Sequence, residues 1–172
     1  YSALDIAVIV NRMHLGCRDK SRILDQIWEK EKVFLHAPYR TNKRKFILDV
    51  YQWSQYFYDK PIIDREIPAI QKDLEHINRT LLAEELTSDF SDLDLFFKSI
   101  RIRILYGYGN DYVRIKLRTL LKKYGYKRRS QLFLQHINRR MLFYHLEATL
   151  PGGVPCTIED IDLDQMLTFR VI

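Results

Sequence analysis

The chain has 172 residues, of which 47% are hydrophobic and 29% charged, with a formal net charge of +6. This composition is typical of a globular protein with one domain or two small ones, and it excludes a disordered chain. No apolar run approaches the roughly 20 residues that a membrane span needs. The cysteines, Cys17 and Cys156, have no framework or metal-site spacing, so we expect a reduced, intracellular, cytoplasmic protein.

The N-terminal half predicts a helical domain over residues 1–90. Ser2 and Asp5 have the spacing of a capping box, which predicts a helix to about Met13. Apolar residues at helical spacing predict further helices over about 20–35 and 46–58, and another that begins at Pro68. The basic stretch 36–45 between two of them is expected to be a loop, either a second phosphate contact or a solvated segment.

Acidic residues in this half suggest a nuclease only weakly. Asp25 and Glu29 lie one helical turn apart, as on an ordinary solvated helix face. A nuclease that uses these acids stays an alternative, and it predicts cleavage that depends on a divalent metal. The acids of residues 87–94 are better interpreted as helix-capping residues than as metal ligands.

Positive charge is concentrated between Lys98 and His145. This segment holds 13 Lys and Arg residues and one acid, Asp111, which gives a net charge of +12. A focused basic region attracts polymers that carry phosphate.

The elements expected after Leu93 have a recognisable order. Alternation of Ile and Arg predicts a strand over 100–104, followed by helices over 112–124 and 130–148. Strands are expected over 157–161 and 167–171. Helix, strand, helix, turn, helix, strand, strand is the order of a winged helix-turn-helix. The expected fold class is therefore mainly α (α+β), with a winged-helix domain over 91–172 that contains a short three-stranded sheet.

Ten residues of this segment are candidates for contact with nucleic acid. The first helix would direct a basic row toward the backbone: Arg114, Arg118 and Lys122. The turn would clamp phosphates with three cations: Lys127, Arg128 and Arg129. The second helix would offer side chains that hydrogen-bond to base edges: Gln131, Gln135, Asn138 and Arg139.

The C-terminal hairpin carries the opposite charge, with acids at Glu159, Asp160, Asp162 and Asp164. Phosphate would repel these side chains. We therefore expect the hairpin to point away from nucleic acid or to pack on a protein partner.

Three stretches carry a resemblance: KLRTLLKKYGYKRRS (116–130), the helix from Ile137 to Leu146, and DIDLDQMLTF (160–169). Together they resemble small winged-helix-like modules of prokaryotic multidomain proteins of the restriction and phage-defence type. The resemblance spans residues 112–172 and does not extend to residues 1–97. It implies a role in sensing or positioning DNA in a defence or regulatory complex, beside an effector.

The sequence therefore predicts a DNA-binding protein or subunit, with duplex DNA as the favoured ligand. The alternatives are an adaptor whose basic helices hold an acidic protein, and an RNA-binding protein in which Tyr and Arg stack on bases. The N-terminal helices would suit a homodimer. We expect no catalytic residues, cofactor or metal, because the five histidines are scattered and His136 and His145 lie nine residues apart.

Overall fold

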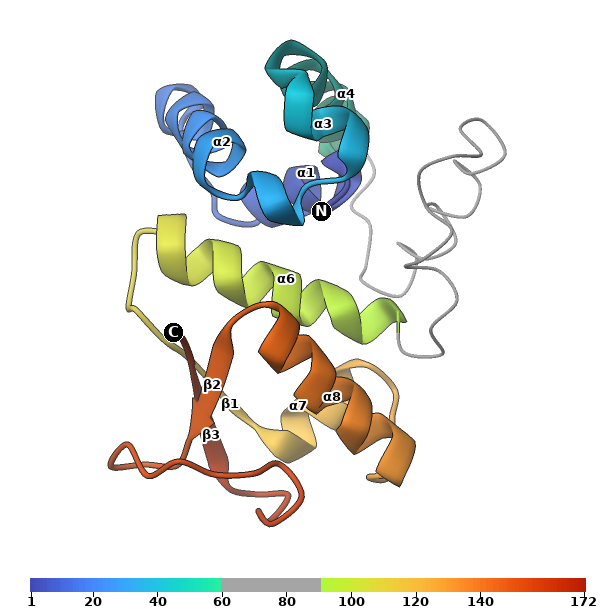
Figure 1. The fold of residues 1–172 in the computed structure, drawn as a ribbon, viewed down its shortest axis with the longest axis vertical. Helices are drawn as coiled ribbons and strands as arrows, with labels where there is room; N and C mark the ends of the chain where they lie inside the picture. The colour runs from blue at the N-terminus through green and yellow to red at the C-terminus, as the bar shows by residue number, and fades with distance from the viewer. Residues whose placement is uncertain (60–90) are drawn as a thin grey trace. The chain divides into compact units, whose positions relative to one another are not determined.

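A computed structural model describes residues 1–59 and 91–172, which belong to two compact units, Tyr1–Ser88 and Asp89–Ile172 (Figure 1). The helix predicted from Pro68, and Asp89 among the predicted capping acids, lie outside the described residues.

The first unit begins with α1 (Ala3–Asn11), and its N-terminus has the predicted capping box. The Asp5 amide donates to Ser2 Oγ at 3.0 Å, and the Ser2 amide donates to Asp5 Oδ2 at 2.8 Å. Two amides that lack a helical partner are thereby satisfied, which lets this end of the helix be buried. Every residue from Ala3 to Val10 is buried, as expected for a helix that is apolar on most sides.

The other elements of this unit are α2 (Cys17–Lys30), the 3₁₀ helix η1 (Lys32–Phe34), α3 (Ala37–Thr41) and α4 (Lys43–Asp59). Ile23, Leu24 and Ile27 form the buried side of α2, and α4 packs on α1. The prediction of a loop over 36–45 was wrong, because this stretch holds α3 and the start of α4. Proline in the first turn favours α3, and Asn42 Oδ1 accepts the Lys45 amide at 2.9 Å at the start of α4.

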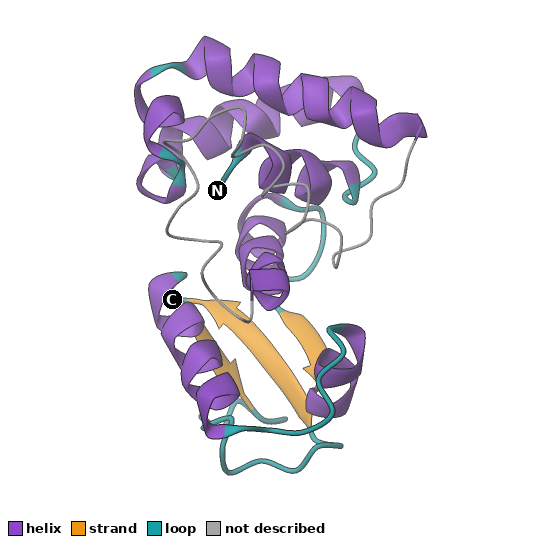
Figure 2. Ribbon diagram, turned by 90° about the vertical axis from the view of Figure 1, so that its right-hand side faces the viewer, coloured by secondary structure: helices purple, strands orange, loops and turns teal. Residues whose placement is uncertain are grey.

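The second unit consists of α6 (Ser91–Tyr106), β1 (Val113–Lys116), α7 (Leu117–Lys123), α8 (Gln131–Phe143), β2 (Leu146–Thr149) and β3 (Met166–Val171). The strands form one antiparallel sheet in the order β1-β3-β2. Figure 2 shows this small sheet among the helices of the unit. The chain is thus mainly helical with a small three-stranded sheet, which confirms the coarse fold class.

The strand predicted over 100–104 was wrong, because this stretch lies inside α6. Alternation of Ile and Arg indicates a strand only if the arginines face water. Arg101 instead is buried between Ile100 and Ile102, and its guanidinium donates to the Tyr144 carbonyl at 2.9 Å. The alternating pattern thus placed Arg101 on the solvent face of a strand, whereas Arg101 is a buried helical residue that is bonded to a carbonyl.

The first strand instead is β1, so the helix predicted from Tyr112 begins only at Leu117. Val113 and Ile115 are half-buried and alternate with exposed Arg114 and Lys116, a period-2 pattern that the basic row had obscured.

The two remaining differences concern the C-terminal strands. The helix predicted to residue 148 ends at Phe143, because His145 adopts a left-handed φ of 50°. The next residues form β2, while the strand predicted over 157–161 is part of the loop between β2 and β3. The last strand, β3, was predicted correctly, and the ring of Phe169 lies edge-on to Phe96 and Phe97 of α6.

Candidate nucleic-acid interface

Helices α7 and α8 and their connecting turn carry most of the candidate residues. Ser130 caps α8 by accepting the Phe133 amide at 3.2 Å, and Gly125 takes the positive φ that the chain needs after α7. Phe133, Leu134 and Ile137 are the buried side of α8. The opposite side of this helix therefore faces solvent.

The structure leaves nine of the ten candidates exposed. Arg129 is half-buried. The exposed candidates lie on β1, α7, the turn and α8: Arg114; Arg118 and Lys122; Lys127 and Arg128; Gln131, Gln135, Asn138 and Arg139. In the last group, Gln131, Gln135 and Arg139 lie at positions i, i+4 and i+8 and form a row along α8.

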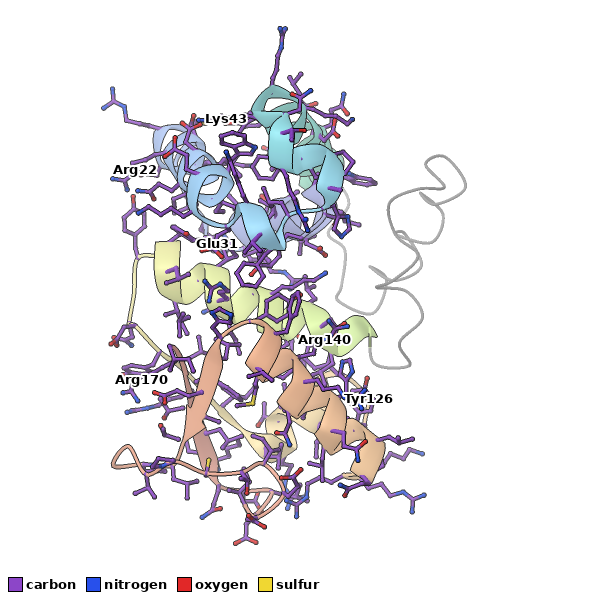
Figure 3. The ribbon with its side chains drawn as sticks, viewed as in Figure 1. Arg22, Glu31, Lys43, Tyr126, Arg140 and Arg170 are labelled. Carbon is purple, nitrogen blue, oxygen red and sulfur yellow. The ribbon has the colours of Figure 1, made fainter. Side chains whose placement is uncertain are left out.

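The predicted basic row of the first helix does not exist, because Arg114 lies on the strand. The Arg114 guanidinium lies 4.6 Å from the ring centre of Tyr112, and its Nε donates to Thr168 Oγ1 at 3.3 Å. Arg170 of β3 lies 5.6 Å from the same ring (Figure 3). Since side chains alternate across a strand, these residues occupy the face of the sheet opposite Phe169.

Residues 157–165, hereafter the acidic loop, contact three of the other candidates, and two of them, Arg118 and Asn138, are bound by its carboxylates. Arg118 donates two hydrogen bonds to Asp164, from Nε at 2.7 Å and from Nη2 at 2.8 Å. These hydrogen bonds raise the pKa of Arg118 and lower the pKa of the Asp164 carboxyl. Asn138 Nδ2 donates to Glu159 Oε1 at 2.9 Å. The acids expected to avoid the basic surface thus lie against part of it.

Arg129 holds the backbone of the acidic loop. Its Nη1 lies 3.3, 3.2 and 2.5 Å from the carbonyl oxygens of Ile158, Glu159 and Ile161. Three acceptors converge on one guanidinium nitrogen, which makes Arg129 a structural residue of the loop in this state of the protein.

The candidates left with no partner among the described residues lie on α7, the turn and α8. They are Lys122, Lys127, Arg128, Gln131, Gln135 and Arg139, hereafter the open surface. Three apolar side chains of α8 are also exposed: Leu132 at 70%, Leu142 at 79% and Phe143 at 53%. Sequence reasoning missed these exposed side chains, although the helical periodicity of α8 places none of them among the inward residues.

Sequence reasoning also missed a buried ion cluster between α6 and α8. Asp94 accepts from His136 Nε2 at 2.6 Å and from Arg140 Nη2 at 2.8 Å. Figure 3 shows Arg140 on the side of α8 that faces α6. The three side chains fix the orientation of α8, and therefore the direction of its exposed side. The sequence signal that could have indicated this cluster is the spacing of His136 and Arg140, which lie one helical turn apart.

Asp25 and Glu29, the acids of the nuclease alternative, share one lysine partner in the N-terminal unit. Lys43 Nζ lies 3.0 Å from Asp25 and 3.5 Å from Glu29. Among the described residues, no three His, Cys, Asp or Glu side chains gather in a group that could hold a metal ion. No helix within residues 1–59 and 91–172 has the length and apolar character to cross a membrane.

Comparison with protein-family models, curated proteins and solved structures found no match to the chain. The resemblance of residues 112–172 to restriction and phage-defence modules therefore stays a prediction.

Proposed function

We propose that the chain binds duplex DNA through a winged helix-turn-helix formed by residues 91–172. The order α6, β1, α7, α8, β2, β3 with the sheet order β1-β3-β2 supports this proposal. In such a domain the second helix of the pair enters the major groove, and here that helix is α8. The loop between β2 and β3 takes the place of the wing.

The open surface is the observation that carries the proposal. Gln131, Gln135 and Arg139 lie one turn apart along the exposed side of α8. Glutamine can bond adenine through two hydrogen bonds, and arginine can do the same with guanine. Lys127 and Arg128, just before α8, suit the phosphates that flank a groove.

The number of free cations sets the expected salt dependence. Lys122, Lys127 and Arg128 are exposed and suited to phosphate contact. Each phosphate neutralised contributes about −0.9 to the slope of log K against log salt, so we expect a slope of about −3. Base contacts by α8 would add affinity without a steeper slope.

Fluorescence anisotropy with labelled duplex DNA, single-stranded DNA and RNA over a salt series tests the proposal. The variant Lys127→Glu/Arg128→Glu should weaken duplex binding at least tenfold. Arg129 is kept intact because its substitution would disturb the acidic loop. The matched control is Arg18→Glu/Lys30→Glu, which makes the same charge change at exposed positions of the other unit. An equal loss in both variants, or no duplex binding at low salt, would refute the proposal; tighter binding of RNA would favour the RNA alternative.

A protein partner is the second candidate, because Leu132, Leu142 and Phe143 are exposed on α8. Exposed apolar side chains beside a polar row are typical of a helix that contacts protein. The chain would then be an adaptor or subunit that holds an acidic partner through its basic helices. Leu132→Ser/Leu142→Ser should abolish co-purification of such a partner while leaving DNA binding intact.

A further inference from the structure

We infer that the acidic loop is a built-in competitor of nucleic acid, which occupies with carboxylates two of the side chains that α7 and α8 would offer to DNA. This inference rests on the proposed function and concerns the regulation of the same surface. In the structure described here, Arg118 and Asn138 are engaged by Asp164 and Glu159.

The geometry of the Arg118 contact supports this inference. Two parallel hydrogen bonds of 2.7 and 2.8 Å join the guanidinium to both carboxylate oxygens. An arginine binds two oxygens of a phosphate in the same manner. Asp164 therefore occupies the Nε–Nη2 edge of Arg118, and a DNA phosphate that binds this edge has to displace the carboxylate.

The loop backbone keeps these carboxylates in place. The Arg118 amide donates to the Leu163 carbonyl at 2.7 Å, next to Asp164 in the chain. On the other side, Arg129 binds the carbonyls of Ile158 and Ile161. Because the backbone is anchored on both sides, exchange with phosphate requires side-chain rotation and no refolding of the loop. An anchored carboxylate also has a high effective concentration beside its arginine.

The contact is weak enough to be displaced. The side chains of Arg118 and Asp164 are 60% and 65% exposed, so water screens their attraction. A DNA that engages only phosphates would have to displace Asp164, whereas a site that also satisfies α8 in the major groove gains further contacts. Displacing Asp164 costs the same free energy in both cases, so the acidic loop lowers both affinities by the same factor, and the further contacts of α8 keep the specific site the tighter one.

The test compares Asp164→Asn with Asp162→Asn in the full chain. Both variants remove one negative charge from the acidic loop, but Asp162 is exposed and its side chain has no partner among the described residues. The net charge of the loop therefore changes equally, while only Asp164→Asn releases Arg118 and removes the attraction between Asp164 and Lys116. We expect Asp164→Asn to bind non-specific duplex DNA about threefold to fivefold more tightly than Asp162→Asn.

The salt slope gives a second readout that a purely structural role would not change. If the released Arg118 contacts a phosphate, the slope of Asp164→Asn should be steeper by about 0.9, while Asp162→Asn keeps the wild-type slope. Arg118→Gln and Arg118→Gln/Asp164→Asn complete a double-mutant cycle, in which adding Asp164→Asn to Arg118→Gln should bring neither gain because no guanidinium is left to release. Glu159→Ala, which removes the acceptor of Asn138 Nδ2, provides an independent variant should Asp164→Asn fail to fold.

Each outcome decides between the two proposals. Tighter binding and a steeper slope for Asp164→Asn would support the competitor. Wild-type DNA binding with identical behaviour of Asp164→Asn and Asp162→Asn would overturn the inference and leave the proposed function standing. Absence of DNA binding in the wild type and all variants would overturn both.

Discussion

The substitution Asp94→Ala should destabilise the second unit by about 3 kcal/mol. The Asp94 side chain is 6% exposed and accepts from His136 and Arg140, whose side chains are 12% and 22% exposed. Removing one partner of a buried ion pair costs about 3–5 kcal/mol, because the remaining charge loses its compensation. Partial access of Arg140 to water places the expected loss at the lower end.

Urea unfolding measures this loss, with two signals that distinguish the units. Far-UV circular dichroism reports the whole chain, whereas both tryptophans, Trp28 and Trp53, lie in the first unit. We expect Asp94→Ala to shift the dichroism transition and to leave the tryptophan transition nearly unchanged. The control Asp111→Ala removes an exposed acid from the same unit and should cost less than about 0.5 kcal/mol. A loss below about 1 kcal/mol for Asp94→Ala, or an equal loss in the control, would refute the argument from burial.

Two further predictions concern the acidic loop. Arg129→Ala should accelerate amide hydrogen exchange across residues 157–162, because three loop carbonyls lose their donor; unchanged exchange would mean that other contacts hold the loop. The Asp164 carboxyl should titrate by NMR with a pKa below its ordinary value of 3.8, and Arg118→Gln should raise this pKa because the hydrogen bond from Arg118 is its largest cause. Because the folded-state pKa of Asp164 is lowered, its contribution to stability is present above pH 3.8 and is lost as the pH falls through the folded pKa. A titration of Asp164 that Arg118→Gln does not alter would contradict this assignment.

Local sequence signals predicted local structure well. The spacing of Ser2 and Asp5 identified the first helix and its cap, since both hydrogen bonds join residues three positions apart. Alternation of Leu167, Phe169 and Val171 identified the last strand, of which Leu167 and Phe169 lie in the core. In α8, periodicity separated the buried residues from the exposed polar row. Such signals succeed when a side chain's chemical class matches its environment.

Several of the failures share a physical cause, which is contact between residues far apart in the chain. Arg101 reaches the carbonyl of residue 144, and Asp94 binds residues of α8. Arg118 and Arg129 find their acceptors in the acidic loop. Periodicity assigns charged residues to the solvent, so it cannot anticipate a charge that the tertiary structure satisfies.

The position of β3 has a consequence for the order of events during synthesis and folding. β3 lies between β1 and β2, yet it is the last of the unit's elements to leave the ribosome. Until β3 is inserted, β1 and β2 have no strand to pair with, and both present open edges. The basic helices α7 and α8 therefore emerge before the strand that completes their support.

Asp164 precedes β3 by only two residues. Insertion of the central strand and delivery of its carboxylate to Arg118 are thus one event. A nascent or partly folded chain exposes its cations without the carboxylates that later cover two of the candidate side chains. Completion of the sheet thus determines when carboxylates first pair with part of the positive charge of this unit.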